Sequence, residues 1–282
     1  MNSSFLIYGR QGKKFEFTKP AVMAILNATP DSFSDGGDID LPDALHSRIE
    51  QVIKQGTDII DVGGESTRPG YAVVAGQEEI GRVVPVIRAI REVNQDIPIS
   101  IDTRKAEVAE AALSAGADFV NDVSALTDPD MANIITRNGC SIIMMRHEAL
   151  ENNLSESCKL QTAQLIEFAQ QRGISKQQIL LDPGLGFGDL ATQDFQSLPG
   201  GNVAANLELV HSIDSYSHNL PVVIGASRKR FVGQLSGEIE AKDRLAGSIA
   251  IAYMALRQGV SILRVHDISQ TVQVRDIVLS NR

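Results

Sequence analysis

The stretch Asp58-Ile59-Ile60-Asp61-Val62-Gly63-Gly64-Glu65-Ser66-Thr67-Arg68-Pro69-Gly70 begins as a short apolar run and ends in acids, glycines, hydroxyls and one arginine. A turn after a buried strand needs a glycine or a proline, but it needs neither two carboxylates nor a guanidinium. Polar groups at the end of a buried strand are costly unless they are used. We therefore interpret this stretch as a β-strand that ends at the mouth of a ligand-binding site.

The same pattern of an apolar run that ends in polar residues occurs eight times along the chain. The segments between the runs have helical periodicity, as in residues 82–93 and 105–115. Near-continuous apolar strands are buried on both faces, which is typical of a parallel sheet, and eight strand–helix units fit a closed barrel. The sequence thus predicts the α/β class and a (β/α)₈ TIM barrel. The runs are residues 22–28, 58–63, 97–102, 118–122, 140–145, 178–182, 221–226 and 261–265.

Two further patterns agree with a barrel. Residues 5–19 alternate apolar and polar around Gly9-Arg10-Gln11-Gly12, which predicts a β-hairpin within residues 1–20 that could close the bottom of the barrel. Five glycines come shortly before a predicted strand, where a left-handed glycine would end the preceding helix. No linker or low-complexity segment interrupts the chain, so we expect residues 1–282 to form one domain. The glycines are Gly56, Gly116, Gly139, Gly173 and Gly259.

Composition and charge narrow the classes of function. The 282 residues carry a formal net charge of −9, which argues against a nucleic-acid or an anionic-membrane surface. The two cysteines, Cys140 and Cys158, have no metal-type spacing and cannot form a disulfide framework, which fits a reducing compartment. No apolar stretch is long enough to cross a membrane, and the first residues show no cleavage-like pattern. We therefore expect a cytoplasmic protein that acts on a small molecule, without nucleic-acid or membrane partners.

Polar residues follow all eight predicted strands, and in a (β/α)₈ barrel the C-terminal strand ends carry the chemistry. The loop of residues 29–37 after the first strand has little to bury and is predicted to be a mobile lid. In chain order, the polar residues at the strand ends are Asn27; Asp61, Glu65, Thr67 and Arg68; Asp102 and Thr103; Asn121 and Asp122; Arg146 and His147; Asp182; Ser227, Arg228, Lys229 and Arg230; and Arg264, His266 and Asp267.

Not every polar residue at a strand end binds a ligand. A single aspartate after a strand is more often a helix N-cap, and Asp122 and Asp267 fit that interpretation. Asp182 precedes a proline and three glycines whose backbone lets a ligand approach closely, so a site residue is favoured there. Alternation along a strand places Arg264 and His266 on one face, and such a pair favours an anion.

Other charged residues and histidines are expected to be solvated, and the two cysteines are expected to be packing residues, because no base is paired with either. The residues expected at the surface include Glu78, Glu79, His46, His211 and His218.

The predicted mouth of the barrel combines hydrogen-bond acceptors with cations. Carboxylates and carboxamides suit the amino and lactam edge of a nitrogen heterocycle, while arginines and Mg²⁺ suit a phosphate. The sequence has no P-loop, no zinc-type cluster and no Ser/His/Asp ordering, so an anion site would be built from side chains and helix N-termini. The acceptors are Asp61, Asp102, Asn121 and Asp182, and the cations are Arg68, Lys229 and Arg264, to which His266 would add when protonated.

Five motifs together run from about residue 20 to residue 280. They are Leu26-Asn27-Ala28-Thr29-Pro30-Asp31-Ser32-Phe33-Ser34-Asp35-Gly36-Gly37, the Asp61–Gly70 part of the opening stretch, Asp182-Pro183-Gly184-Leu185-Gly186-Phe187-Gly188, Ser227-Arg228-Lys229 and Arg264-Val265-His266-Asp267. With these motifs the chain resembles the dihydropteroate synthase family of the folate pathway, which is the target of sulfonamides.

The resemblance implies a fold, a reaction and partners. It implies a pterin-binding (β/α)₈ barrel and a transferase of folate biosynthesis. The reaction joins 6-hydroxymethyl-7,8-dihydropterin pyrophosphate to p-aminobenzoate and gives 7,8-dihydropteroate and pyrophosphate, with Mg²⁺ as the cofactor. It also implies a homodimer.

The resemblance also implies a role for each matching residue. The catalytic residues would be Asp102, Lys229 and Arg68. The pterin would be held by Asp102, Asn121, Asp182 and Lys229, and p-aminobenzoate by Thr67, Arg68, Phe187 and Ser227. The phosphates would be bound by Asn27, Arg68, Arg264 and His266, with Asn27 as the Mg²⁺ ligand.

The chain departs from the family pattern at three places. After the fifth predicted strand the family commonly has His-Met-x-Gly, whereas this chain has Met145-Arg146-His147-Glu148, and Asp189 stands where a lysine is usual. About ten extra residues within 193–205 suggest a longer surface loop. These departures leave two alternatives to a synthase. One is a non-catalytic pterin-binding paralogue, and the other is a barrel that transfers a methyl group from methyltetrahydrofolate, against which Thr67, Arg68 and the Ser227-Arg228-Lys229 motif argue.

Overall fold

The computed structural model describes residues 4–28, 41–65, 74–146, 153–187, 201–238 and 240–280. Eight short strands alternate with helices through these residues, and each strand overlaps one of the eight predicted apolar runs. The side chains on both faces of these strands are mostly buried, as expected for strands between a barrel core and a helix layer. The strands are β3 (Ala21–Asn27), β4 (Ile59–Gly63), β5 (Ile99–Asp102), β6 (Phe119–Asp122), β7 (Ile142–Met145), β8 (Ile179–Asp182), β9 (Val223–Ile224) and β10 (Ile262–Val265).

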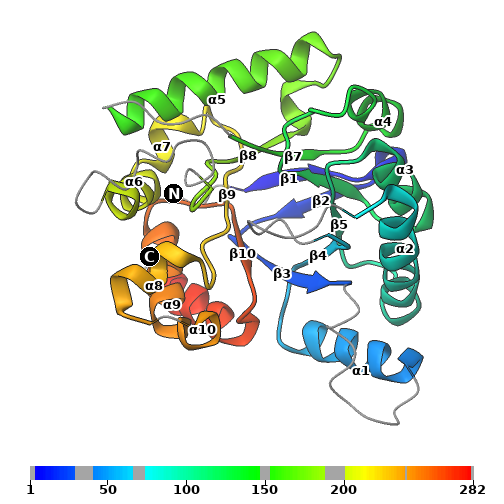
Figure 1. The fold of residues 1–282 in the computed structure, drawn as a ribbon, viewed down its shortest axis with the longest axis horizontal. Coiled ribbons are helices and arrows are strands. Elements are labelled where there is room, and N and C mark those ends of the chain that lie inside the picture. The colour runs from blue at the N-terminus through cyan, green and yellow to red at the C-terminus, as the bar shows by residue number, and fades with distance from the viewer. Residues whose placement is uncertain are drawn as a thin grey trace.

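These strands form one parallel sheet in the order β8-β7-β6-β5-β4-β3-β10-β9. A parallel bridge between Leu181 and Val222 brings the two outer strands together and closes the ring. The N–H of Leu181 donates to the carbonyl of Pro221 at 2.9 Å in the same place. The helices lie around the outside of the strands (Figure 1). The predicted (β/α)₈ barrel is therefore confirmed.

The helices bury the face that their periodicity predicts. In α2, Val83, Val86, Ile87 and Ile90 are all buried against the sheet. All five glycines expected to end a helix have a positive φ, between 64° and 128°. The helices are α1 (Leu41–Lys54), α2 (Gly76–Val93), α3 (Ala106–Ala115), α4 (Met131–Asn138), α5 (Leu154–Gln171), α6 (Gly201–His211), α7 (Ile213–Tyr216), α8 (Arg230–Ser236), α9 (Leu245–Arg257) and α10 (Ile268–Ser280), with short 3₁₀ turns at Arg10–Gly12, Lys176–Gln178 and Ala241–Asp243.

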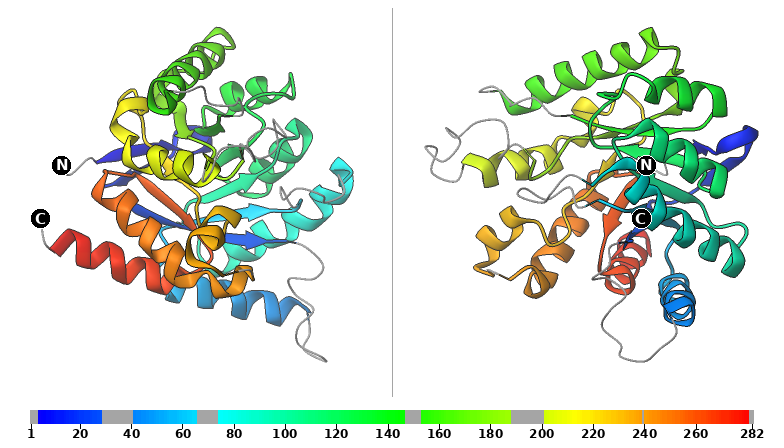
Figure 2. Two further views of the ribbon diagram at one scale, coloured as in Figure 1. Left: turned by 60° about the vertical axis from the view of Figure 1, so that its left-hand side comes forward. Right: turned by 45° about the vertical axis from the view of Figure 1, so that its right-hand side comes forward.

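The predicted N-terminal hairpin is present as β1 (Phe5–Tyr8) and β2 (Lys14–Phe17), which pair antiparallel. It lies at the end of the barrel where the strands begin (Figure 2). The N–H of Tyr8 donates to Ser141 Oγ at 2.9 Å, and the N–H of Arg10 donates to the carbonyl of Asp118 at 3.0 Å. Ser141 directly precedes β7, and Asp118 directly precedes β6. The hairpin therefore covers the bottom of the barrel.

Two surface predictions are wrong. Glu79 is only 1% exposed, because it lies on the buried face of α2, and Lys105 Nζ donates to its Oε2 at 2.5 Å. His218 is half-buried, and its Nε2 lies 3.0 Å from Thr162 Oγ1. Glu78 and His211 are exposed as predicted, and His46 is partly exposed, with its side chain 37% accessible to solvent.

The cysteines are packing residues as predicted. Cys140 and Cys158 are both buried free thiols that form no disulfide, and burial raises the pKa of each to about 12. Among the helices that the structure describes, none is both long and apolar enough to cross a membrane.

A buried ion pair between Asp118 and Arg91 joins elements at the bottom of the barrel. Asp118 accepts from the N–H of Ile99 at 2.8 Å and from Arg91 Nη2 at 2.5 Å. Arg91 also donates to the carbonyls of Gly116 at 3.0 Å and Ile97 at 2.7 Å. Asp118 therefore joins α2 to the first residues of β5 and β6. These contacts at the bottom of the barrel contribute to stability, since the chemistry of such barrels lies at the other end.

Replacing Asp118 by alanine is expected to lower the free energy of unfolding by about 3 kcal/mol, because it leaves Arg91 and a buried N–H without their partner. Urea unfolding followed by circular dichroism measures this loss. The matched control is Glu110→Ala, which removes an exposed ion pair with Arg137 and should cost less than about 0.5 kcal/mol. Equal unfolding midpoints for the two variants would contradict the structural role of Asp118.

Candidate active site

An acid–arginine–acid cluster forms the floor of the barrel mouth. Arg264 at the end of β10 donates from Nε to Asp61 Oδ2 at 2.6 Å and from Nη2 to Asp102 Oδ2 at 2.5 Å. Asn121 Nδ2 donates to the same oxygen of Asp61 at 3.1 Å. These four residues come from β10, β4, β5 and β6, so the barrel joins residues that are up to 203 positions apart.

The strand register explains how the cluster assembles. Asp102 on β5 lies beside Asn121 on β6 and beside Gly63 on β4. A Cβ at Gly63 would lie 3.5 Å from the Cβ of Asp102, in ordinary contact. Gly63 therefore lies directly against the side chain of Asp102.

The cluster is electrostatically unusual. Burial raises the pKa of Asp102 to about 7; Arg264 opposes the rise, and Asp61 adds to it. The Oδ1 atoms of Asp61 and Asp102 have no hydrogen-bond partner among the described residues, which fits this loss of solvation. Burial opposes the charge of Arg264, but Asp61 and Asp102 raise its pKa above the ordinary value. The arginine thus stays charged while Asp102 can titrate near neutral pH.

A second group of residues lies at the end of β8. Asp182 is 8% exposed, and its Oδ1 accepts from the N–H of Gly184 at 2.7 Å. A Cβ at Gly225 would lie 3.9 Å from Arg264 and 4.0 Å from Asp182 Oδ2. Gly225, directly after β9, therefore adjoins both Asp182 and the cluster on the floor.

Lys229 covers one side of this group. Its Nζ lies 4.1 Å from the ring centroid of Phe187 and donates to the carbonyl of Leu185. Burial lowers the pKa of Lys229 to about 8, although the charge of Asp182 opposes the shift. Burial raises the pKa of Asp182, and Lys229 is the first of the groups that oppose it. The lysine and the aspartate thus support each other's charged forms.

Ser227 and His266 form a pair beside Lys229. Ser227 Oγ lies 3.1 Å from His266 Nδ1 and accepts from the N–H of His266 at 3.2 Å. Between Ser227 and Lys229, Arg228 has a φ of 60°, a strained conformation for a residue with a side chain. Its Nε and Nη2 donate to Asp267 at 3.1 and 2.5 Å, which holds the turn in place.

The structure contradicts one of the two predicted helix caps and places the other directly before a helix. Asp122 accepts from the N–H groups of Ser124 and Leu126, both at 2.8 Å, and so closes the turn after β6. The helix-cap prediction is wrong for Asp122, because α4 begins only at Met131. Asp267 directly precedes α10, and its carboxylate is engaged by Arg228.

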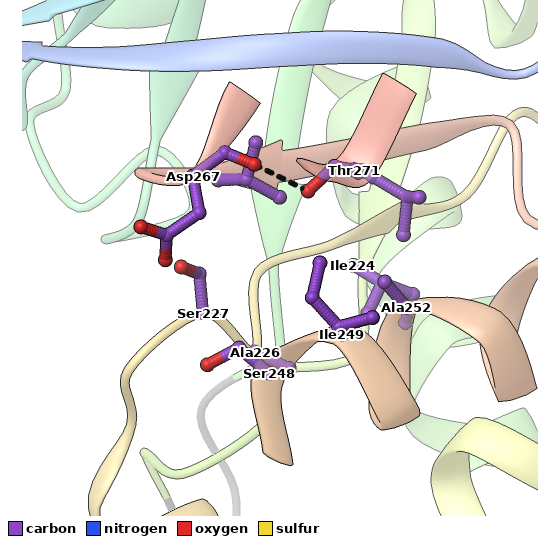
Figure 3. Close-up of a pocket in the computed structure, with 10 residues that line it drawn as sticks. Ile224, Ala226, Ser227, Ser248, Ile249, Ala252, Asp267 and Thr271 are labelled. Atoms are coloured by element: carbon purple, nitrogen blue, oxygen red, sulfur yellow. Dashed lines mark hydrogen bonds between the residues drawn. The ribbon is translucent and has the colours of Figure 1, made fainter. Parts of the chain in front are cut away.

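A small pocket lies behind Ser227, between β9, β10 and the helices α9 and α10 (Figure 3). Its wall is largely apolar, with Ile224, Ile249 and Ala252 among its residues. Thr271 Oγ1 donates to the carbonyl of Asp267 at its edge, at 2.8 Å. None of Asp102, Asn121 and Asp182 lines this pocket, so it is separate from the cluster at the strand ends.

A support layer that the sequence did not reveal lies beneath the end of β4. Glu65 accepts from Lys105 Nζ at 2.7 Å, from Arg104 Nη2 and from the N–H of Val74 at 3.0 Å. Burial alone would raise the pKa of Glu65, but these hydrogen bonds lower it. Lys105 also binds the buried Glu79. Glu65 therefore supports the end of β4.

The structure brings together Asp102, Asn121, Asp182, Lys229 and Arg264, with Phe187, Ser227 and His266 beside Lys229. Asn27 ends β3, where it pairs with Gly63 and is exposed. Other predictions concern residues outside the described ranges: Thr67 and Arg68, the loop 29–37, His147 and Glu148, Asp189 and most of the extra segment 193–205.

Comparisons with known proteins agree on one family. Residues 23–266 match the family described as pterin binding enzyme. The dihydropteroate synthase of Escherichia coli (strain K12) is 38% identical over 280 residues, which cover 95% of this chain and 94% of that protein. The structure of Xanthomonas albilineans dihydropteroate synthase with 4-aminobenzoic acid has a TM-score of 0.86 at 34% identity and covers 98% of this chain and 97% of that chain. The complex of that organism's enzyme with 7,8-dihydropteroate has a TM-score of 0.84 at 32% identity and covers 98% of each chain.

Proposed function

This chain belongs to the family of pterin-binding enzymes, and we propose that the cluster of Asp61, Asp102 and Arg264 is the floor of its pterin site. The chain is a transferase with dihydropteroate synthase activity. It condenses 6-hydroxymethyl-7,8-dihydropterin pyrophosphate with p-aminobenzoate to give 7,8-dihydropteroate and pyrophosphate. The observation that supports our assignment of the site is the convergence of Asp102, Asn121 and Asp182 at one end of the barrel.

The proposed pterin residues are Asp102, Asn121, Asp182 and Lys229. Carboxylates accept from the amino group and ring N–H groups of a pterin, while the amide of Asn121 and the ammonium of Lys229 donate to its ring acceptors. All four residues are largely withdrawn from solvent, where such hydrogen bonds discriminate strongly between ligands.

The proposed p-aminobenzoate residues adjoin the pterin residues. The ring of Phe187 packs against Lys229 Nζ, and Ser227 precedes Lys229 by two residues. We assign them to p-aminobenzoate together with Thr67 and Arg68. The phosphates are assigned to Asn27, Arg68, Arg264 and His266, since the hydrogen bond between His266 and Ser227 links the anion side to the second substrate.

Mg²⁺ is the proposed cofactor, with Asn27 as its protein ligand. The carboxamide of Asn27 is exposed at the end of β3, and oxygen donors of this type suit Mg²⁺. Within the described residues, no group of three or more His, Cys, Asp and Glu side chains is placed to hold a metal. A single protein carboxamide, such as that of Asn27, fits a cation that is otherwise bound by phosphate oxygens and water. When bound, Mg²⁺ would neutralise charge on the leaving pyrophosphate.

The residues of the site stabilise charges rather than form a covalent intermediate. Departure of pyrophosphate from the pterin methylene leaves a delocalised cation, and the fixed negative charge of Asp102 stabilises it. Lys229 holds the ring, and Arg68 binds the departing anion and p-aminobenzoate. The neutral amine of p-aminobenzoate then attacks the methylene carbon, and the proton lost from the nitrogen passes to solvent. No protein nucleophile is required.

The proposed function is tested by pyrophosphate release from the purified protein with both substrates and Mg²⁺. Calorimetry with the pterin pyrophosphate alone distinguishes a non-catalytic paralogue, which would bind it without releasing pyrophosphate in the full reaction. Absence of both binding and release would contradict the proposed site. We further propose that sulfonamides compete with p-aminobenzoate, which the same assay measures as a rise in the KM for p-aminobenzoate.

Asp182→Ala and Arg68→Ala are expected to affect different substrates. Asp182→Ala should weaken binding of the pterin pyrophosphate by about 10- to 100-fold, because partners left unpaired in a buried site cost about 1–3 kcal/mol. Arg68→Ala should mainly raise the KM for p-aminobenzoate. Calorimetry and steady-state kinetics on both variants separate these effects, and equal losses of pterin binding would refute this division.

We also propose that the protein is a homodimer in the cytoplasm. Leu235, Tyr253 and Ile277 are exposed on α8, α9 and α10, and α9 packs against both of the other helices, so apolar surface is available for a second copy. The buried thiols of Cys140 and Cys158 fit a reducing compartment. Sedimentation velocity of the purified protein tests the dimer, and a single monomeric species would contradict it.

A further inference from the structure

Arg146, which stands where the family pattern has a different residue, lies directly under the turn that carries Asp182. It follows β7 and is only 6% exposed. Its N–H donates to the carbonyl of Asp182 at 3.0 Å, and its Nε donates to the carbonyl of Pro183 at 3.0 Å. Arg146 therefore donates hydrogen bonds to two successive carbonyl groups of the turn.

The third residue of the turn is pressed against the same arginine. Gly184 has a φ of 75°, and a Cβ at this position would lie 2.6 Å from the carbonyl oxygen of Arg146. The N–H of Gly184 in turn donates to Asp182 Oδ1 at 2.7 Å. The carboxylate of Asp182 is thus oriented by a backbone segment whose position Arg146 fixes.

We propose that Arg146 is a positioning residue for the pterin site, which aims the Asp182 carboxylate at the ligand and supplies positive charge behind it. This inference rests on the proposed role of Asp182 in pterin binding. Arg146 acts through Pro183 and Gly184 rather than by contact with the substrate.

The arginine is anchored from outside the barrel. Its Nη1 donates to Gln161 Oε1 on α5 at 3.0 Å. Since α5 packs outside β7 and β8, Gln161 connects the helix layer to the turn at the strand end. Removal of the Gln161 side chain should therefore loosen the position of the Arg146 guanidinium, and with it the orientation of Asp182, while the charge of Arg146 remains.

The charge of Arg146 matters because Asp182 is buried. Burial raises the pKa of Asp182, and this is opposed by Lys229 before α8, the N–H of Gly184, Arg264 of β10 and Arg146 of β7. The other titratable groups near it, Cys158 of α5 and Tyr216 of α7, have raised pKa values and remain neutral. Removal of Arg146 should consequently raise the pKa of Asp182 and shift the loss of pterin binding to higher pH.

The test compares Arg146→Met, Arg146→Lys and Gln161→Leu with the wild type. The probe is the pterin pyrophosphate with Mg²⁺ and without p-aminobenzoate, titrated calorimetrically between pH 6 and 8.5. Arg146→Met should weaken binding by about 10- to 100-fold and move the acid limb of binding to higher pH. Arg146→Lys keeps the charge but loses the Pro183 contact, so binding should weaken by about 3- to 10-fold with the pH dependence of the wild type. Gln161→Leu should resemble Arg146→Lys.

Arg137→Met, at an exposed arginine of α4, is the matched control and should bind as the wild type does.

Circular dichroism first establishes that each variant is folded. If Arg146→Met does not fold, the Lys and Leu variants decide the matter, and wild-type affinity in both would overturn the proposal. Folded Arg146→Met with an affinity within about twofold of the wild type and an unchanged pH dependence would overturn it as well. A wild type that binds no pterin pyrophosphate would overturn the proposed function itself, which is a different result from a wild type that binds while the variants bind equally well.

Discussion

Arg264→Met is expected to lower the free energy of unfolding by about 3–5 kcal/mol, because it leaves two buried carboxylates without their common cation. Asp61 is fully buried and Asp102 is 6% exposed, and each accepts a hydrogen bond from the guanidinium in the structure. Methionine fills part of the volume but supplies neither charge nor donors. Chemical unfolding of the wild type and the variant measures the difference.

The loss should depend on pH in a definite direction. In the wild type, burial raises the pKa of Asp102 to about 7, above its ordinary value of 3.8. A carboxyl whose pKa is raised on folding favours the folded state less as pH rises from its ordinary pKa through the folded pKa. Removal of Arg264 raises the folded pKa further, so the variant should lose more stability at pH 8 than at pH 5.

Two further variants separate the charge of Arg264 from its geometry. Arg264→Lys keeps the charge and should lie between the wild type and Arg264→Met. The double variant Asp61→Asn/Arg264→Met removes one of the stranded charges and should recover part of the stability at pH 8. A free energy of unfolding for Arg264→Met within about 1 kcal/mol of the wild type at pH 8 would show that the cluster does not hold the mouth together.

The barrel could be predicted from the sequence because its signals are local. Each buried strand requires a run of apolar residues, as in Asp58–Gly63, and each helix end requires a turn that a glycine such as Gly116 makes easily. The position of Asp102, Asp182 and Arg264 at strand ends follows from the same signals, since parallel strands place all their C-terminal ends at one mouth.

Partners across elements could not be predicted, because periodicity says which face a residue occupies and not what it meets there. Glu79 lies on the same helical face as Val83 and Val86, and that spacing was a signal of burial. Its partner Lys105 belongs to another element, and only the fold brings the two together. Arg146 was noticed as a departure from the family pattern, but its contact with Pro183 depends on the pairing of β7 with β8.

The charge of Arg264 affects the orientation and the ionisation of Asp102 as well as the stability of the fold. The guanidinium binds one oxygen of Asp102 and one of Asp61, so it fixes the orientation of Asp102 while partly offsetting its charge. A carboxyl with a pKa of about 7 is half ionised at pH 7, and its ionised fraction rises above that pH and falls below it. The charge that we assign to cation stabilisation therefore grows as the pH rises through neutrality.

Asp102→Asn should lower kcat by about 10²- to 10³-fold while it changes the affinity for the pterin pyrophosphate much less. Asparagine keeps the size of aspartate and still accepts from Arg264, so the shape of the pterin site is retained. It lacks the negative charge that stabilises the delocalised cation after pyrophosphate leaves. The expected signature is a loss in kcat and in kcat/KM for the pterin substrate, with a dissociation constant within about tenfold of the wild type.

The pH dependence of this variant supplies the decisive comparison. The wild-type rate should fall about tenfold per pH unit below the pKa of Asp102, since the ionised form is the active one. Asp102→Asn has no such group and should lose this acid limb, so the two rates converge as pH falls. Glu110→Gln, which changes an exposed carboxylate of α3, is the matched control and should keep both the rate and the limb. An Asp102→Asn enzyme with kcat within about threefold of the wild type would show that the charge of Asp102 does not stabilise the cation. An acid limb retained by that variant would assign the limb to a group other than Asp102.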